Sequence, residues 1–105
     1  PWDLGKDVEH SSVCSEIVPM PGVVIEQGEI ALQVNGTVQQ HSDVNKLIWN
    51  IREIIADLSL FYHLVPGDLI YTGTPEGVGA VKPGDHITGQ VAGVGEVSLH
   101  VGQPA

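Results

Sequence analysis

The sequence predicts a β-rich α+β domain, in which a mixed and mostly antiparallel sheet carries one main amphipathic helix on one side. Two segments, 30–40 and 87–101, each show two short runs around a glycine turn, with apolar and polar residues alternating in all but the mostly polar run 37–40, which is typical of β-hairpins. A third segment, 47–62, repeats apolar residues at intervals of three and four, which is typical of a helix. The 105 residues, 42% of them hydrophobic, indicate one small globular domain over 1–105.

The bulk composition excludes several classes of protein. The formal net charge is −9 with only four lysines and arginines, whereas nucleic-acid binding needs a basic surface. No apolar run approaches the ~20 residues of a membrane span, and no signal-peptide pattern is present, so we expect no membrane partner. The single cysteine, Cys14, excludes an internal disulfide and suits a reducing compartment, which predicts a cytoplasmic protein. Its expected environment is a buried apolar one.

The first strands are expected at 13–18 and in the hairpin 30–40. Apolar and polar residues alternate over 13–18, and Pro19 ends this run. In the hairpin, Asn35-Gly36 is the preferred pair for a type I′ turn, because both central residues need a positive φ. The return strand is mostly polar, which places it near an edge of the sheet or facing solvent.

The helix is expected to begin after Ser42 or Asp43, either of which can cap it. Its apolar stripe extends over 47–62. Trp49 and Leu60 do not fit the stripe, and at about 100° per residue they share the outer face. Isolated exposed apolar residues are common, but this pair also fits contact with a partner chain. The polar residues opposite the stripe are Asn50, Glu53 and Asp57.

One loop, 71–79, stands out as a candidate site. It lies between two copies of a Pro-Gly-Asp phrase, at 66–70 and 83–87, and each copy predicts a type II turn that leads into a strand. The loop contains Thr72, Gly73 and Thr74, and glycines allow close backbone approach while hydroxyls and amides bind carboxylates. The alternative, which these residues favour equally, is an ordinary connecting loop that contains glycine and proline.

Other catalytic and metal-binding patterns are absent from the sequence. No nucleophile elbow, phosphate-binding loop or dinucleotide fingerprint occurs. The acidic residues include no paired Glu-x-Glu on a strand for a hard cation. The histidines lack metal-ligand spacing, so surface or strand positions are expected for all of them: His10, His41, His63, His86 and His100.

Three phrases together resemble the fumarylacetoacetate hydrolase family. They are 1–6 (PWDLGK), 32–40 (LQVNGTVQQ) and 66–79 (PGDLIYTGTPEGVG), in the order and spacing of the family's C-terminal half. The last phrase is the most specific. Within the family the chain is most similar to acylpyruvate hydrolases, fumarylpyruvate hydrolase in particular, which serve aromatic-compound catabolism. Because the chain starts with Pro1 rather than methionine, we expect it to be the C-terminal portion of a longer catalytic domain.

The resemblance implies a fold, a reaction and a cofactor. The fold is a mixed β-sandwich roll with few helices, commonly assembled as a homodimer. The substrate is a small 2-oxo acid, whose C–C bond is hydrolysed to give pyruvate and a carboxylic acid. A Mg²⁺ or Mn²⁺ ion binds the 2-oxo acid and stabilises the enolate charge. The family's metal ligands, a Glu-x-Glu pair and an aspartate, precede the Pro-Trp phrase, so no metal ligand is expected in this chain.

The resemblance also assigns roles to residues of this chain. Lys6 matches the family's active-site lysine, which binds a substrate oxygen and stabilises the leaving enolate. Thr72 matches the threonine that binds the substrate carboxylate, and Gly73 and Thr74 shape its loop. For Lys6 the plainer alternative is a solvated ion pair with neighbouring acids.

Several alternative functions stay open at this point. The same enolate chemistry serves an oxaloacetate decarboxylase or an isomerase of unsaturated 2-oxo diacids. A chain without the metal ligands and without the family's lid His/Glu pair also fits an inactive fragment or a binding or dimerisation module. A third possibility is that another polypeptide completes the site, and the 105 residues alone are not expected to turn over substrate. The acyl group of the substrate and the identity of the metal are not determined by these residues.

Overall fold

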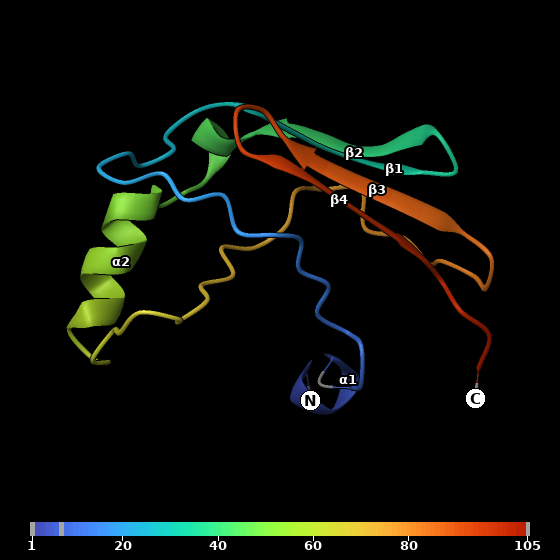
Figure 1. Cartoon of the computed structure of the whole chain (residues 1–105), viewed down its shortest axis with the longest axis horizontal. Coiled ribbons are helices and arrows are strands. Elements are labelled where there is room, and N and C mark those ends of the chain that lie inside the picture. Colours follow the sequence, from blue (N-terminus) through green and yellow to red (C-terminus); the bar gives the residue numbers. More distant parts are fainter. Residues whose placement is uncertain (1, 7, 105) are drawn as a thin grey trace.

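A computed structural model of the protein describes residues 2–6 and 8–104 (Figure 1). It contains a four-stranded sheet in the order β2-β1-β3-β4, in which every neighbouring pair of strands is antiparallel. This arrangement, with few helices, confirms the β-rich α+β fold class. The elements are α1 (Trp2–Lys6), β1 (Glu29–Val34), β2 (Thr37–Asp43), the 3-10 helix η1 (Val44–Lys46), α2 (Ile51–Ser59), β3 (His86–Val91) and β4 (Gly95–His100).

The hairpin of β1 and β2 has the predicted turn. Asn35 has φ 52° and Gly36 has φ 81°, so both central residues adopt the positive φ of a type I′ turn. The register shifts between Leu32 and Gln33, which indicates a β-bulge. Strand β2 lies at one edge of the sheet, as its polar composition predicts.

Strands β3 and β4 form the second predicted hairpin. It closes through a bond from the Val94 amide to the Val91 carbonyl at 3.0 Å. At the opposite end, His86 and His100 are cross-strand partners whose rings stack with centroids 4.3 Å apart. All five histidines are exposed, as predicted.

Both Pro-Gly-Asp phrases form the predicted type II turn. In each copy the aspartate amide donates to the carbonyl three residues earlier at 3.1 Å. The turn glycines have closely similar positive φ values, 97° for Gly67 and 93° for Gly84. The local sequence therefore specifies this turn twice, in two different surroundings.

Only the second of these turns leads into a strand. Asp85 is buried, and its carboxylate accepts bonds from the Lys82 amide at 3.0 Å and the Asn35 side chain at 2.9 Å. The Asn35 side-chain oxygen also accepts from the His86 amide at 2.9 Å, so the β1–β2 turn holds the start of β3. The prediction of a strand after the first copy, at 69–70, was wrong, because this segment pairs with no strand of the described chain.

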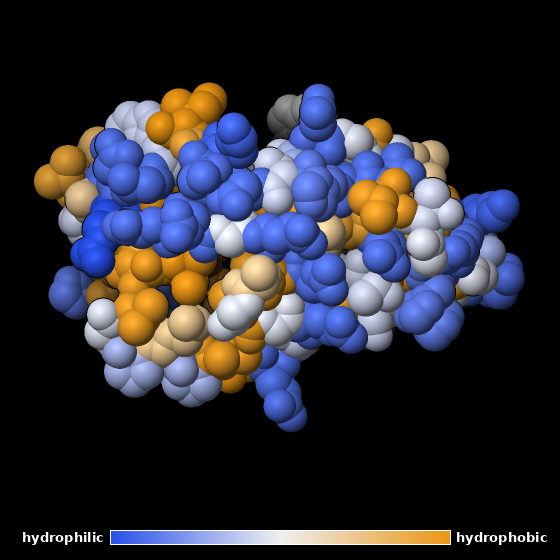
Figure 2. Space-filling model, turned by 90° about the horizontal axis from the view of Figure 1, so that it is seen from above, coloured by the Kyte–Doolittle hydropathy of each residue, from blue (hydrophilic) through white to orange (hydrophobic). Residues whose placement is uncertain are grey.

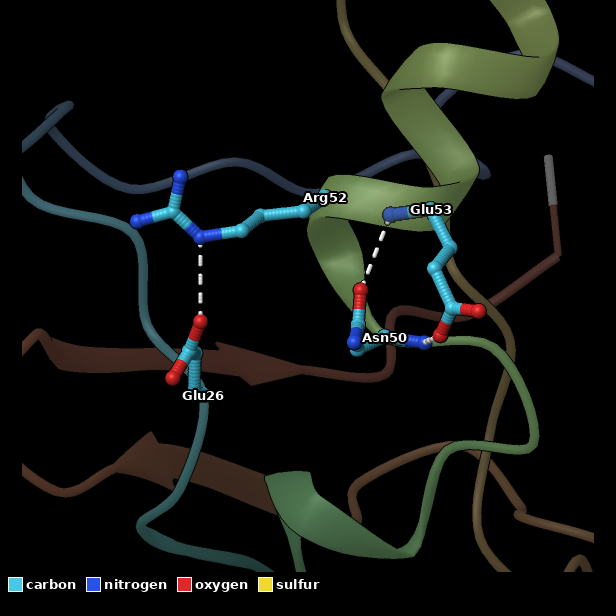
Figure 3. Close-up of polar contacts among 4 residues, drawn as sticks. All are labelled: Glu26, Asn50, Arg52 and Glu53. Atoms are coloured by element: carbon cyan, nitrogen blue, oxygen red, sulfur yellow. Dashed lines mark hydrogen bonds and ion pairs between the residues drawn. The ribbon is translucent and has the colours of Figure 1, made fainter.

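The predicted start of the helix was also wrong. Asp43 caps η1 rather than a long helix, by accepting from the Asn45 amide at 2.9 Å. Helix α2 begins at Ile51, where Asn50 and Glu53 form a reciprocal capping box (Figure 3). The Asn50 side chain accepts from the Glu53 amide at 2.8 Å, and the Glu53 carboxylate accepts from the Asn50 amide at 3.0 Å. A local cap therefore overrides the continuous apolar pattern.

This later start changes the position of several helical residues. Trp49 precedes α2 and Leu60 caps its C-terminus, so the two do not share an outer helical face, contrary to the prediction. In Figure 1, α2 lies beyond one end of the sheet rather than flat on a face. An ion pair from Arg52 of α2 to Glu26, at 3.0 Å, links the helix to the segment before β1 (Figure 3).

The strand predicted at 13–18 is absent, because this segment runs along a face of the sheet rather than beside an edge strand. Its residues line a cavity together with Ala31 of β1 and Gly89 of β3. A segment in this position cannot form ladder hydrogen bonds with the sheet. Cys14, expected to be buried, is exposed.

Little of the apolar surface is covered within the described residues. Ala31 is the only hydrophobic residue that is buried there, whereas Ile48, Leu60 and Phe61 are at least three-quarters exposed. Figure 2 shows apolar surface gathered at the end of the molecule where α2 lies. None of the helices in the described ranges is both long and apolar enough to cross a membrane.

Candidate functional site

The predicted loop 71–79 borders the larger of two neighbouring cavities, of about 610 Å³, between α2 and the sheet. Thr72, Gly73 and Thr74 all line this cavity, so the structure brings together three of the four predicted site residues. Its apolar walls come from β1, β3, the segment before α2, and α2 itself. They include Ile30, Leu47, Ile51, Ile54 and Val91.

Strand β2 holds the loop through two consecutive glutamines. The side-chain amide of Gln40 donates to the Thr74 hydroxyl oxygen at 2.9 Å and to the Pro75 carbonyl at 2.8 Å. The side-chain amide of Gln39 donates to the Gly77 carbonyl at 3.1 Å. These contacts explain why a loop without regular secondary structure has a defined position against the edge strand.

The approach at Gly77 is too close for any side chain. A Cβ atom built there would lie 2.4 Å from the Gln39 carbonyl oxygen, and the φ of Gly77 is 100°. Gly73 has φ 116° but no atom within 4 Å of such a Cβ. Glycine is therefore required at 77 by contact and by conformation, and at 73 by conformation alone.

The other end of the loop is held by a different contact. The Tyr71 hydroxyl hydrogen-bonds the Ser12 hydroxyl, which ties the loop to the segment after α1. A second cavity, of about 510 Å³, lies between the loop, the sheet face and the segment 14–18. Gly73 and Thr74 line both cavities, whereas Thr72 lines only the larger one.

Lys6, the fourth predicted site residue, lies in a different place. It is the last residue of α1 and is exposed, and it does not line either cavity. Figure 1 shows α1 well apart from the sheet and from α2. The role of Lys6 stays a prediction. Pro1 and Asp7, which belong to or adjoin the same sequence phrase, lie outside the described residues.

The described residues do not fit a divalent cation site. No group of three or more histidine, cysteine, aspartate or glutamate side chains converges in the described ranges. Hard cations need several oxygen ligands, and the polar lining of the larger cavity offers mainly hydroxyls, one carboxylate and one ammonium: Ser42, Asp43, Lys46, Thr72 and Thr74.

The carboxylate in this lining is already engaged. Backbone bonds from the Asn45 and Gly28 amides lower the pKa of Asp43, and the nearby charge of Lys46 lowers it further. Asp43 therefore stays ionised, and its carboxylate accepts a hydrogen bond from the backbone at the start of η1. Its negative charge beside the cavity is offset by the ammonium of Lys46.

Sequence reasoning missed Lys46 and Gln40. Both are distant from the loop along the chain, and the Gln40–Thr74 bond spans 34 residues. No local sequence pattern predicts such a contact. The phrase 32–40, which contributes to the family resemblance, was the available signal for Gln40.

Comparison with known proteins identifies the family. Residues 1–102 match the family model for the fumarylacetoacetate (FAA) hydrolase C-terminal region. The chain is 72% identical over 102 residues to a fumarylpyruvate hydrolase of a Ralstonia species, covering 97% of this chain and 53% of that protein. It is 34% identical to the mitochondrial oxaloacetate tautomerase FAHD2 of Oryza sativa subsp. japonica, covering 96% of this chain and 45% of that protein.

A solved structure supports the same relationship. The fumarylpyruvate hydrolase from Pseudomonas aeruginosa, in complex with Mn²⁺ and pyruvate, matches with a TM-score of 0.74 and 46% identity. The match covers 76% of this chain and 34% of that one. The chain thus spans about half the length of the curated relatives named above, or less. It belongs to the fumarylacetoacetate hydrolase family.

Proposed function

We propose that this chain is the substrate-side portion of an acylpyruvate hydrolase, with fumarylpyruvate as its substrate. The observation that carries the proposal is the loop 71–79, whose Thr72 and Thr74 line one cavity in a chain 72% identical to a fumarylpyruvate hydrolase. We assign residues 1–105 to one portion of the catalytic domain, in a cytoplasmic homodimer that acts in aromatic-compound catabolism.

The loop supplies hydrogen-bond donors for a carboxylate. No side-chain hydrogen bond engages the Thr72 hydroxyl within the described residues, and the residue is exposed toward the cavity it lines. A hydroxyl and backbone amides on a glycine-containing loop suit the carboxylate of a 2-oxo acid. The long apolar walls suit the carbon chain of the acyl group.

The reaction needs positive charge where the bond breaks. Water adds to the acyl carbonyl, the C–C bond cleaves, and its electron pair passes to the pyruvate portion as an enolate that then takes a proton. An ammonium near that oxygen stabilises the charge, and this is the role we propose for Lys6. Mn²⁺ accompanies pyruvate in the Pseudomonas aeruginosa relative. We propose the same type of cation here, held by ligands outside the described residues.

A chimera tests this function directly. The segment of the Ralstonia fumarylpyruvate hydrolase that this chain matches is replaced by the chain, and fumarylpyruvate turnover is measured with Mn²⁺ present. We expect turnover by the chimera, and a loss of at least tenfold in kcat/KM for Thr72→Val and for Lys6→Ala. Thr37→Val and Lys82→Ala, which remove the same groups at positions without an assigned site role, are matched controls and are expected to stay near wild type.

Each outcome discriminates between assignments. A folded chimera without turnover contradicts the hydrolase function, and unchanged turnover in Lys6→Ala removes that residue from the mechanism. Oxaloacetate is supplied as a second substrate, because the rice relative is an oxaloacetate tautomerase. Conversion of oxaloacetate without cleavage of fumarylpyruvate would indicate oxaloacetate tautomerase activity instead of the hydrolase activity.

A further inference from the structure

We propose that Gln40 is a positioning residue that orients the Thr74 hydroxyl to donate its hydrogen to the carboxylate of a 2-oxo acid. This inference deepens the proposed function and rests on it. It adds a residue of β2 to a site that the loop alone had defined.

The geometry makes Gln40 a donor and Thr74 an acceptor. The Gln40 side-chain nitrogen lies 2.9 Å from the Thr74 hydroxyl oxygen and 2.8 Å from the Pro75 carbonyl oxygen. An amide nitrogen carries two hydrogens, and these two short contacts use both. A third contact, to the Glu76 carbonyl, is longer at 3.4 Å. Two carbonyl acceptors also determine which end of the Gln40 amide faces the loop.

This pattern leaves the Thr74 hydrogen available. A hydroxyl has one hydrogen and two lone pairs, so it still donates while its oxygen accepts from Gln40. As a donor within the described residues it reaches the Pro75 carbonyl at 3.5 Å, well beyond the ~2.5–3.0 Å of ordinary O–H···O bonds. That carbonyl already accepts from Gln40. Thr74 also lines the cavity beside Thr72, so a carboxylate there can accept its hydrogen.

The substitution Gln40→Glu would reverse the polarity of this contact. When ionised, the introduced carboxylate would accept a hydrogen bond from the Thr74 hydroxyl, which could then no longer donate to the ligand. The carboxylate would also repel the Pro75 carbonyl and an anionic ligand. When protonated, it could again donate. Because an ordinary glutamate titrates near pKa 4.3, acidification toward that value should begin to restore donation.

The test measures pyruvate binding to the Mn²⁺-loaded chimera by calorimetry at pH 7 and pH 5. We expect Gln40→Leu and Gln40→Glu each to weaken binding at pH 7 by about tenfold, the loss of one hydrogen bond to a charged acceptor. Gln40→Glu should regain affinity at pH 5, whereas Gln40→Leu should not. Gln27→Glu adds the same charge at an exposed glutamine that lines neither cavity, and should change affinity less than twofold between the two pH values.

A double-mutant cycle with Thr74→Val completes the test. If Gln40 acts through the Thr74 hydroxyl, Gln40→Leu adds no further loss in a Thr74→Val background. Additive losses overturn the inference while leaving the hydrolase function intact. A wild-type chimera that folds but binds no pyruvate overturns the proposed function itself. Hydrogen exchange on the 105-residue chain tests whether Gln40 holds the loop at all. Unchanged protection of 74–79 in Gln40→Leu rejects any role of Gln40 at the loop.

Discussion

At the scale of single residues, Asp85 carries the clearest electrostatic consequence. The bond from the Lys82 amide, and then the bond from the Asn35 side chain, lower the pKa of this carboxyl below its ordinary value of 3.8. A group whose pKa is depressed by folding contributes stability that is complete above the unfolded value. That contribution is lost as the pH falls through the folded value.

The expected result is a pH-dependent difference between wild type and Asp85→Asn. The variant should be less stable at pH 7, and the difference in the free energy of unfolding should narrow as the pH falls below about 4. Chemical unfolding followed by circular dichroism at several pH values measures this. Asp68→Asn is the matched control, because Asp68 accepts the same turn bond from the Val65 amide without an asparagine contact. A difference that widens in acid would contradict the assignment.

Gly77 and Gly73 separate steric from conformational requirements within the site loop. Gly77→Ala should displace the loop from β2, because its Cβ would overlap the Gln39 carbonyl oxygen. Gly73→Ala should incur only the cost of a positive φ, on the order of 1–2 kcal/mol. Hydrogen exchange should therefore show greater loss of protection over 74–79 in Gly77→Ala than in Gly73→Ala. Equal protection in the two variants would mean that the close approach does not hold the loop.

At the scale of elements, α2 depends on its N-terminal cap. Asn50→Ala removes the acceptor for the Glu53 amide and should lower the free energy of unfolding by about 1 kcal/mol. Far-ultraviolet circular dichroism during denaturation measures the change. Asn45→Ala is the control, since Asn45 is exposed and its side chain makes no hydrogen bond within the described part of the chain. Equal effects of the two substitutions would show that the cap does not determine where the helix starts.

The same scale explains how the candidate site is built. An edge strand, a short helix and an irregular loop meet at one cavity, and the loop is held by side chains of β2 rather than by a ladder of backbone bonds. Gln39 and Gln40 can hold it because an edge strand has no neighbour on its outer side. If the loop lay beside β1 instead, it could not be held in this way, because β1 is already paired with β2 on one side and with β3 on the other.

At the scale of the whole molecule, the uncovered apolar surface has a measurable consequence. Side chains around α2 and the following segment are exposed, among them Leu60, Phe61 and Tyr62 at 66% or more. Contiguous surfaces of this kind favour association. The purified chain should show a sedimentation coefficient that rises with concentration and should bind a hydrophobic dye. The chimera should bind less dye, since we expect the added part of the Ralstonia protein to cover these residues. A concentration-independent monomer without dye binding would contradict this expectation.

Sequence alone was sufficient to specify the features that depend on neighbouring residues. The type I′ turn at Asn35-Gly36, the two type II turns and both hairpins follow from φ preferences and alternation within a few residues. The turn and hairpin predictions were confirmed because the free energies that decide them are local. The family phrases also predicted a site at the loop with Thr72 and Thr74; the structure places both residues at a cavity, and their role in binding stays a prediction.

Long-range contacts, by contrast, determine which extended segments pair and what the loop touches. Segments 13–18 and 69–70 have the composition of strands, yet neither has a partner among the described strands, and a strand needs a neighbour to satisfy its backbone. The contact of Gln40 with Thr74 joins residues 34 positions apart, and the cavity exists because α2, η1 and the loop converge. Composition specifies which conformations a segment favours, whereas its hydrogen-bond partners are specified by what the rest of the chain places beside it.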